Sequence, residues 1–330
     1  MADKLETAKL LFKQNRYQEA IDICNQILAI DKNSISAMKL ISKSLFAKRK
    51  LEDARLYLNK VLSINPNDYE VIKDIGNTYQ AIGDVNSAKI YYQKSIEINP
   101  DFAPALTNLG ILELNTINKD KALDLLINAT KSDPELVAAW GNLASGYLQL
   151  GKVKEAENAI RKAIAINPDS FNSHVLLTNI LIDQKRLQEA EIPLRKTIEL
   201  KPDYAEAYSH LGAILKIFGE FEKAEIYTRK AIELKPDYTE AYSNLGTILQ
   251  GLGKLQEAEI SIRKAINLKS DYAEAHLNLG VVLKDLGKLQ DAERSLRRVI
   301  ELKPDYAKGH LNLGVILKDL GKLEDAERSL

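Results

Sequence analysis

The apolar positions of this chain follow helical spacing in short segments that end at regular intervals. Between Gly219 and Pro236, apolar or small side chains recur three or four residues apart, at Ala224, Ile226, Tyr227, Ala231, Ile232 and Leu234. This spacing places them on one side of a helix. A similar segment precedes it, over 203–219. The pattern therefore predicts a helix, a turn and a second helix, repeated along the chain.

The repeat has a fixed length of 34 residues. Proline marks one phase at Pro66, Pro100, Pro134, Pro168, Pro202, Pro236 and Pro304, with Ser270 at the skipped position. Alanine fills another phase at Ala20, Ala54, Ala88, Ala122, Ala156, Ala190, Ala224, Ala258, Ala292 and Ala326. Glycine dominates a third, at Gly76, Gly110, Gly212, Gly246, Gly280 and Gly314. Small residues at fixed phases indicate where two helices approach most closely.

The turns and helix starts also carry local signals. Gly83, Gly151, Gly219, Gly253, Gly287 and Gly321 fall where each first helix should end, a position at which glycine accepts a positive φ. The motifs Asp203-x-x-Glu206, Asp237-x-x-Glu240 and Asp271-x-x-Glu274 predict capping boxes at the start of the next first helix. The predicted fold class is all-α.

These phases resemble the tetratricopeptide repeat, in which an aromatic residue, Leu, Gly, Ala and Pro hold set positions of a helix-turn-helix unit. Trp140, Tyr208 and Tyr242 hold the aromatic position here. The resemblance covers the whole chain, with nine full units over 1–306 and a partial tenth over 307–330. It implies one α-solenoid, a right-handed superhelix whose first helices line the concave face and whose second helices form the outside.

The last units are near copies of each other and have no polar capping helix after them. Residues 276–296 and 310–330 differ at only two places. Because a solenoid usually ends on a cap that covers its last apolar face, we expect residue 330 to be a truncation point or fragment boundary. The uncapped tenth unit also raises the possibility of self-association.

Charge and cysteine content narrow the classes of partner. Lys and Arg together number 46, as do Asp and Glu, so the formal charge is zero and no global field attracts nucleic acid or an anionic membrane. The single cysteine, Cys24, excludes an internal disulfide. The N-terminus is charged at every helical turn, unlike a signal peptide, and no apolar run is long enough to span a membrane. We expect a cytoplasmic protein.

One column of asparagines is a candidate peptide-binding feature of the concave face. It comprises Asn108, Asn142, Asn244, Asn278 and Asn312. Asparagine offers a donor and an acceptor that can pair with the backbone of an extended peptide. The column resembles the asparagine ladder of O-linked N-acetylglucosamine transferases, but Asp74, Leu176 and His210 interrupt it. A consensus surface residue without a binding role is the equally weighted alternative.

A second candidate resembles the carboxylate clamp with which some tetratricopeptide proteins hold a chaperone's C-terminal carboxylate. Lys73, Asn77 and Asn108 match its first three members. The last two should be Lys and Arg but are Ala138 and Asn142. Without these cations the carboxylates lose their charge-assisted partners. The sequence therefore argues against chaperone-tail binding and favours a solvated charge at Lys73.

Near the C-terminus, paired charges and aliphatic residues predict a mixed stripe on the concave face. Lys284 and Lys318 are each followed by an aspartate, Asp285 and Asp319. The aliphatic residues beside them are Leu277, Val281, Leu311 and Val315. The stripe could dock a peptide or a helix, or its charges could simply be solvated.

No metal or catalytic site is expected. His174, His276 and His310 share one repeat position, so neighbouring copies lie on helices packed about 8–10 Å apart, too far for ligands that each bind at about 2 Å from one ion. They are interpreted as substitutes for an aromatic packing residue, and His210 as a polar group of the concave face. No nucleophile with a base and no phosphate-binding loop is present, and no cofactor is expected.

The sequence thus predicts a scaffold that binds a protein or an extended peptide in its concave groove. The alternative is that this array is the substrate-recognising part of a larger enzyme, a glycosyltransferase, sulfotransferase or oxygenase, whose catalytic domain lies beyond residue 330.

Overall fold

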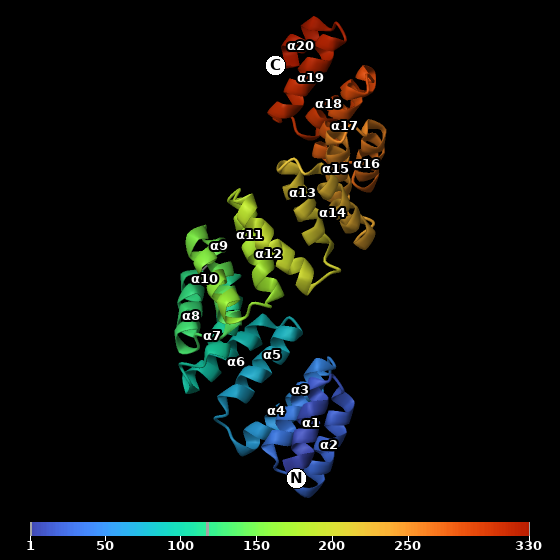
Figure 1. The fold of residues 1–330 in the computed structure, drawn as a ribbon. Coiled ribbons are helices and arrows are strands. Elements are labelled where there is room, and N and C mark those ends of the chain that lie inside the picture. Colours follow the sequence, from blue (N-terminus) through green and yellow to red (C-terminus); the bar gives the residue numbers. More distant parts are fainter. Residues whose placement is uncertain (1, 117–118, 330) are drawn as a thin grey trace. The chain divides into compact units, whose positions relative to one another are not determined.

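A computed structural model describes residues 2–116 and 119–329 (Figure 1), and these residues form helices joined by short turns. The first helix of each pair is α1 (Ala2–Lys13), α3 (Ile35–Ala47), α5 (Tyr69–Ala81), α7 (Ala103–Leu114), α9 (Val137–Gln149), α11 (Phe171–Asp183), α13 (Ala205–Ile217), α15 (Thr239–Gly251), α17 (Ala273–Asp285) and α19 (Ala307–Asp319). The second helix is α2 (Tyr17–Ile30), α4 (Leu51–Ile64), α6 (Val85–Ile98), α8 (Lys119–Ser132), α10 (Val153–Ile166), α12 (Leu187–Leu200), α14 (Phe221–Leu234), α16 (Leu255–Leu268), α18 (Leu289–Leu302) and α20 (Leu323–Ser329). The all-α prediction and its 34-residue period are confirmed.

The helix contacts are those of an α-solenoid. A first helix packs against its own second helix, which packs against the next first helix, as in α13, α14 and α15. Consecutive first helices also contact each other, for example α15 and α17. The chain divides into two compact units, Met1–Ser173 and His174–Leu330, and each is described by itself.

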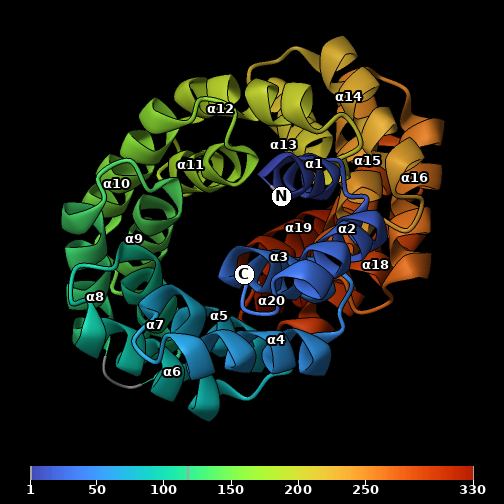
Figure 2. The same cartoon turned by 90° about the horizontal axis from the view of Figure 1, so that it is seen from below.

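The first helices lie on the inner side of the array within each unit. Figure 2 shows α7 and α9 inside α8 and α10 in the first unit, and α13 and α15 inside α14 and α16 in the second. This agrees with the assignment of first helices to the inner face that the resemblance implied. The first helices therefore carry the side chains of the inner face.

The alanine and glycine phases are the closest contacts within each pair. Nine of the ten alanines have no exposed surface, and Ala326 is 7% exposed. A Cβ at Gly246 would lie 2.2 Å from Ile262 Cγ1 and 3.2 Å from the carbonyl oxygen of Ala258. Because Ala258 belongs to the alanine phase, the two phases face each other across a helix pair. The sequence prediction of close contact is confirmed.

Among the described residues, nine first helices are followed two residues later by a residue of positive φ, six of them glycines of the predicted series. Gly83 has a φ of 82° and Gly219 one of 79°. In three pairs the same position holds Asn15, Arg49 or Lys185, with φ of 61°, 61° and 59°. The left-handed turn is therefore imposed by the helix pair even where the residue has a Cβ, at a cost of about 1–2 kcal/mol.

The predicted capping boxes are wrong by one residue. The N-cap of α13 is Tyr204, without a side-chain cap, so Asp203 lies outside the helix. The tyrosine ring is half-buried at the helix start, and the ammonium of Lys201 lies 5.7 Å from the ring centroid. A true side-chain cap occurs in the third repeat, where the equivalent residue is an aspartate and the Val71 amide donates to Asp68 Oδ1 at 3.1 Å.

Two further features have no direct role in the inner face. Cys24 is fully buried, and burial raises the pKa of its thiol to about 11. Across the described part of the chain, no helix combines the length and the apolar character needed to cross a bilayer.

Candidate peptide-binding face

A hollow in the first unit is lined by residues of α1, α3, α4 and α5. Two pockets adjoin there because both are lined by Phe12 and Lys43. One, of about 230 Å³, reaches towards Asp74 and Asn77 on α5. The other, of about 530 Å³, extends along α1 and α3. We call these two adjoining pockets the N-terminal groove.

The floor of the N-terminal groove is apolar. Phe46 is 37% exposed and Leu10 is 56% exposed, although both are large hydrophobic side chains. Phe12 lies between them in the lining and packs against the Tyr17 ring, with centroids 5.5 Å apart. Exposed aromatic and aliphatic surface next to polar groups is typical of a binding surface.

The groove is edged by lysines, and two of these have no acidic partner among the described residues. Lys9 pairs with Glu6 at 2.7 Å. Lys39 pairs with Asp68 at 2.8 Å and Glu70 at 3.1 Å.

Burial opposes the charge of Lys39, but its hydrogen bonds to the two carboxylates outweigh burial and raise its pKa. Lys13 and Lys43 are exposed and make no ion pair in the described part of the chain. Their charges remain available.

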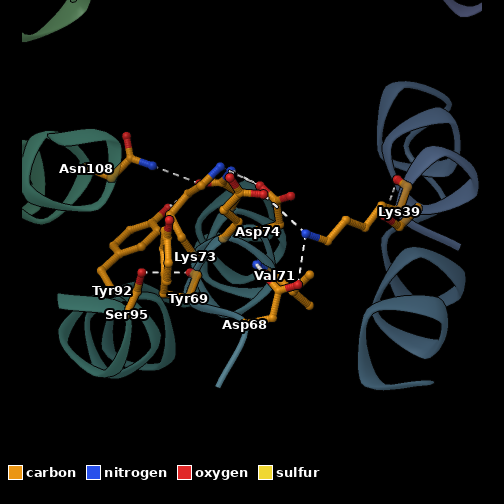
Figure 3. A network of polar contacts seen from close by, with 12 residues as sticks. Lys39, Asp68, Tyr69, Val71, Lys73, Asp74, Tyr92, Ser95 and Asn108 are labelled. Atoms are coloured by element: carbon orange, nitrogen blue, oxygen red, sulfur yellow. Dashed lines mark hydrogen bonds and ion pairs between the residues drawn. The ribbon is translucent and has the colours of Figure 1, made fainter. Parts of the chain in front are cut away.

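Behind the groove lies a network of polar side chains on α5, α6 and α7 (Figure 3). The Tyr92 hydroxyl is buried and donates to Asn77 Oδ1 at 2.9 Å or Gln80 Oε1 at 2.6 Å. Asn108 Nδ2 donates to Asn77 Oδ1 at 2.8 Å, and Asn77 Nδ2 donates to Asp74 Oδ1 at 3.3 Å. Burial also raises the pKa of Tyr92 above its usual range. The network fixes Asn77 at the wall of the groove.

The structure therefore brings Lys73, Asn77 and Asn108 together, but they are engaged with their neighbours. Lys73 pairs with Asp74, and its side chain is only 17% exposed rather than freely solvated. Asn142, the next residue of the asparagine column, donates to the Ala138 carbonyl of its own helix at 2.7 Å. Binding of a partner by these residues stays a prediction.

In the second unit the asparagine column is half-buried on the first helices. Asn278 Nδ2 donates to Ser243 Oγ at 3.1 Å, and Asn312 Nδ2 to the Lys308 carbonyl at 2.8 Å. The side chain of Asn244 makes no hydrogen bond within the described residues. The side-chain Oδ1 atoms of these residues are thus not needed for the fold in the part of the chain described.

The C-terminal stripe is only partly formed as predicted. Lys284 and Lys318 are exposed at the ends of α17 and α19. Leu277, however, is 7% exposed and belongs to the core, whereas Leu311 is 57% exposed. The difference arises because α19 packs on α17, while the described residues place no further first helix against α19.

Lys216 is a half-buried cation on α13, a first helix of the second unit. Burial lowers the pKa of this ammonium against the opposing effect of Glu274. Lys216 Nζ donates to Thr247 Oγ1 at 3.0 Å. Burial also lowers the pKa of His210, against the charge of Glu206, so this histidine is neutral at pH 7.

His276 and His310, at the aromatic position of their repeats, make the same kind of hydrogen bond as Trp140 makes at that position. Trp140 Nε1 donates to the Pro134 carbonyl at 2.8 Å. His276 Nε2 lies 3.0 Å from the Ser270 carbonyl and His310 Nε2 2.6 Å from the Pro304 carbonyl, each six residues upstream. Because a carbonyl only accepts, these Nε2 atoms carry the proton. No group of three metal-ligating side chains occurs within the described residues.

Sequence reasoning missed the N-terminal groove, although its signal was present. Phe12 and Phe46 lie 34 residues apart at one repeat position, and so do Lys9 and Lys43. An aromatic residue and a cation repeated in two neighbouring first helices predict a shared patch. Because this patch involves only the first two repeats, it does not form a column that recurs along the whole chain.

Comparisons with known proteins agree with the repeat. A family model described as Cilia and flagella-associated protein 70 C-terminal domain matches residues 63–278, and the tetratricopeptide repeat model matches 273–306. The chain belongs to the tetratricopeptide repeat family. A search of curated proteins found no match to it.

Solved structures show the same fold. A chain in the crystal structure of the APC/C hetero-tetramer Cut9-Hcn1 is 17% identical with a TM-score of 0.57, and the match covers 91% of this chain and 59% of that one. This chain therefore spans about three fifths of the length of its match. YrrB, described as a TPR protein with an unusual peptide-binding site, is 21% identical with a TM-score of 0.48, covering 56% and 95% of the two chains. A MamA RS-1 double mutant is 20% identical with a TM-score of 0.48, covering 51% and 94%.

Proposed function

We propose that this chain is a scaffold that binds a protein or an extended peptide on the inner face of its first helices. Family membership supports the class of function, because solenoid repeats present extended surfaces to their partners. The observation that carries the proposal is the N-terminal groove, where Phe46 and Leu10 stay exposed beside unpaired lysines. The exposed part of these two side chains is not covered by any described residue.

The asparagine column is proposed as a second contact region in the second unit. Asn244, Asn278 and Asn312 are half-buried and retain side-chain oxygen atoms that the fold does not use in the described residues. A half-buried amide can exchange hydrogen bonds with a peptide backbone without dependence on the peptide's side chains. Binding there is expected to be tolerant of sequence.

The test is a selection of peptides from a random phage-displayed library on the full chain, followed by affinity measurements on variants. Changing Asn244, Asn278 and Asn312 together to Ala should weaken selected peptides that bind the second unit. The matched control changes Asn86, Asn128 and Asn158, exposed asparagines of second helices, to Ala. If both triple variants bind alike, the asparagine column has no role; if no peptide is selected or binding maps to second helices, the proposed function fails.

A further inference from the structure

We propose that the N-terminal groove binds an acidic peptide segment that inserts one bulky apolar side chain between Phe12 and Phe46. This inference rests on the proposed function and specifies the chemistry of the partner. It concerns α1, α3, α4 and α5, so it does not depend on the asparagine column.

The smaller of the two pockets, which reaches towards Asp74 and Asn77, has a size that favours a single side chain over a whole small molecule. Its volume is about 230 Å³, below the range of about 300–1,000 Å³ typical of small-molecule sites. Phe12, Phe46, Ala47 and Leu58 supply its apolar lining. A bulky side chain placed there would cover aromatic surface that is now exposed to water, which is the usual role of an anchor residue.

The charge around the pockets selects the residues next to that anchor. Four lysines, Lys9, Lys13, Lys39 and Lys43, and two acids, Glu6 and Asp74, line the two pockets together, which leaves a surplus of two positive charges. The chain as a whole has a formal charge of zero. The surplus is therefore local, and it favours a partner with carboxylates.

Lys39 is already paired with Asp68 and Glu70, so the charges left for a partner are those of Lys13 and Lys43. Glu6 is bound by Lys9, and Asp74 is bound by Lys73 and Asn77, so neither acid neutralises Lys13 or Lys43. Lys43 lines both pockets, which places its charge beside the anchor position. A carboxylate one or two residues from the anchor would meet it.

The test is fluorescence anisotropy of three labelled peptides of equal length with the full chain. The first has a central Phe flanked by Glu, the second a central Ala flanked by Glu, and the third a central Phe flanked by Lys. We expect the first to bind at least about tenfold more tightly than the others, and added salt to weaken it because the lysines are exposed.

Variants locate the site. Lys43→Glu and Phe46→Ala should each weaken the first peptide at least about tenfold, while Lys162→Glu, which reverses an exposed charge on α10, should leave binding unchanged. Circular dichroism checks that each variant is folded, and Lys43→Glu tests the site independently of any effect of Phe46→Ala on packing.

The proposal is overturned if the three peptides bind alike, if both groove variants bind as the wild type does, or if an unstructured DNA oligonucleotide competes with the first peptide and binds more tightly, which would indicate a general polyanion surface. The library selection distinguishes a failure of this inference from a failure of the proposed function. Enrichment of peptides without acidic residues that bind on first helices would leave the proposed function standing and refute this inference.

Discussion

The two ends of the chain build the same helix pair but arrange its charged side chains differently. In the pairs from α14 to α20, a charged ladder repeats on the second helices: Lys254 binds Glu225 at 2.8 Å, Lys288 binds Glu259 at 2.7 Å, and Lys322 binds Glu293 at 2.6 Å. Each glutamate also binds an arginine one turn further along its own helix, as Glu259 does with Arg263 at 2.9 Å.

The first three pairs have no such ladder. Their positions equivalent to Glu225 hold Ile21, Arg55 and Lys89. In these pairs Lys13 on α1 and Lys43 on α3 line the N-terminal groove without an acidic partner in the described residues. The comparison teaches that the same helix pair can use its charges in ion pairs between outer helices or leave charges of its inner helices outside any ion pair of the described residues.

The largest expected effect concerns the core that both regions share. Gly76→Ala and Gly246→Ala should each lower the free energy of unfolding by about 1–3 kcal/mol, because the new Cβ overpacks the helix pair. At Gly76 it would lie 2.6 Å from the Tyr92 ring, and at Gly246 2.2 Å from Ile262.

Gly141→Ala is the matched control, since no atom lies within 4 Å of its added Cβ. It should instead stabilise the helix by about 0.5–1 kcal/mol. Urea denaturation measures all three. Equal stability of Gly76→Ala, Gly246→Ala and the wild type would show that the close contact is not a shared constraint.

Next in size is the effect of the polar network around Tyr92 in the first unit. Tyr92→Phe removes the hydroxyl that Asn77 and Gln80 accept from, so the free energy of unfolding should fall by about 0.5–1.5 kcal/mol. Tyr242→Phe, at a half-buried tyrosine of the second unit whose hydroxyl makes no hydrogen bond in the described residues, should change it by less than about 0.5 kcal/mol. A similar loss for both in thermal or urea unfolding would contradict the role of the network.

A smaller effect, with a defined pH dependence, is expected from the ladder. The hydrogen bond from Lys288, opposed by burial and assisted by Arg263, lowers the pKa of Glu259 below its ordinary value of 4.5. A lowered folded-state pKa stabilises the protein above the unfolded-state pKa, and this stabilisation is lost as the pH falls through the folded-state value.

Glu259→Gln should therefore cost about 0.2–1 kcal/mol at pH 7, and the gap to the wild type should close as the pH falls below 4.5, where the native carboxylate becomes protonated. Urea denaturation over a pH series measures the gap. A gap that stays constant down to low pH would mean that the charge of Glu259 is not the cause.

The smallest effect on stability is expected in the N-terminal groove. Lys43→Ala should change the free energy of unfolding by less than about 0.5 kcal/mol, because Lys43 is exposed and has no ion pair in the described residues. Lys288→Ala, which breaks a ladder pair, should cost as much as Glu259→Gln. Similar losses for the two lysines would show that the groove lysine also supports the fold, and would erase the contrast between the two regions.

Local sequence patterns predicted the helix pairs and their small-residue contacts well, because most of the packing of a helix pair lies within the pair. The alanine and glycine phases had to face each other, since only small residues allow that approach. The capping boxes failed because the register of a helix start is decided by what it packs on. Tyr204 occupies the N-cap position of α13, one residue after Asp203.

The sequence by itself determined the period, the predicted helix starts and ends to within one or two residues and the small-residue contacts, because these depend on residues of one repeat and its neighbour. Only the tertiary structure decided which charges are paired. The same residue type, lysine, is bound to a carboxylate at Lys288 and unpaired at Lys43. Pairing depends on what an adjacent helix places within about 4 Å, and a repeat pattern read along one chain does not specify that distance.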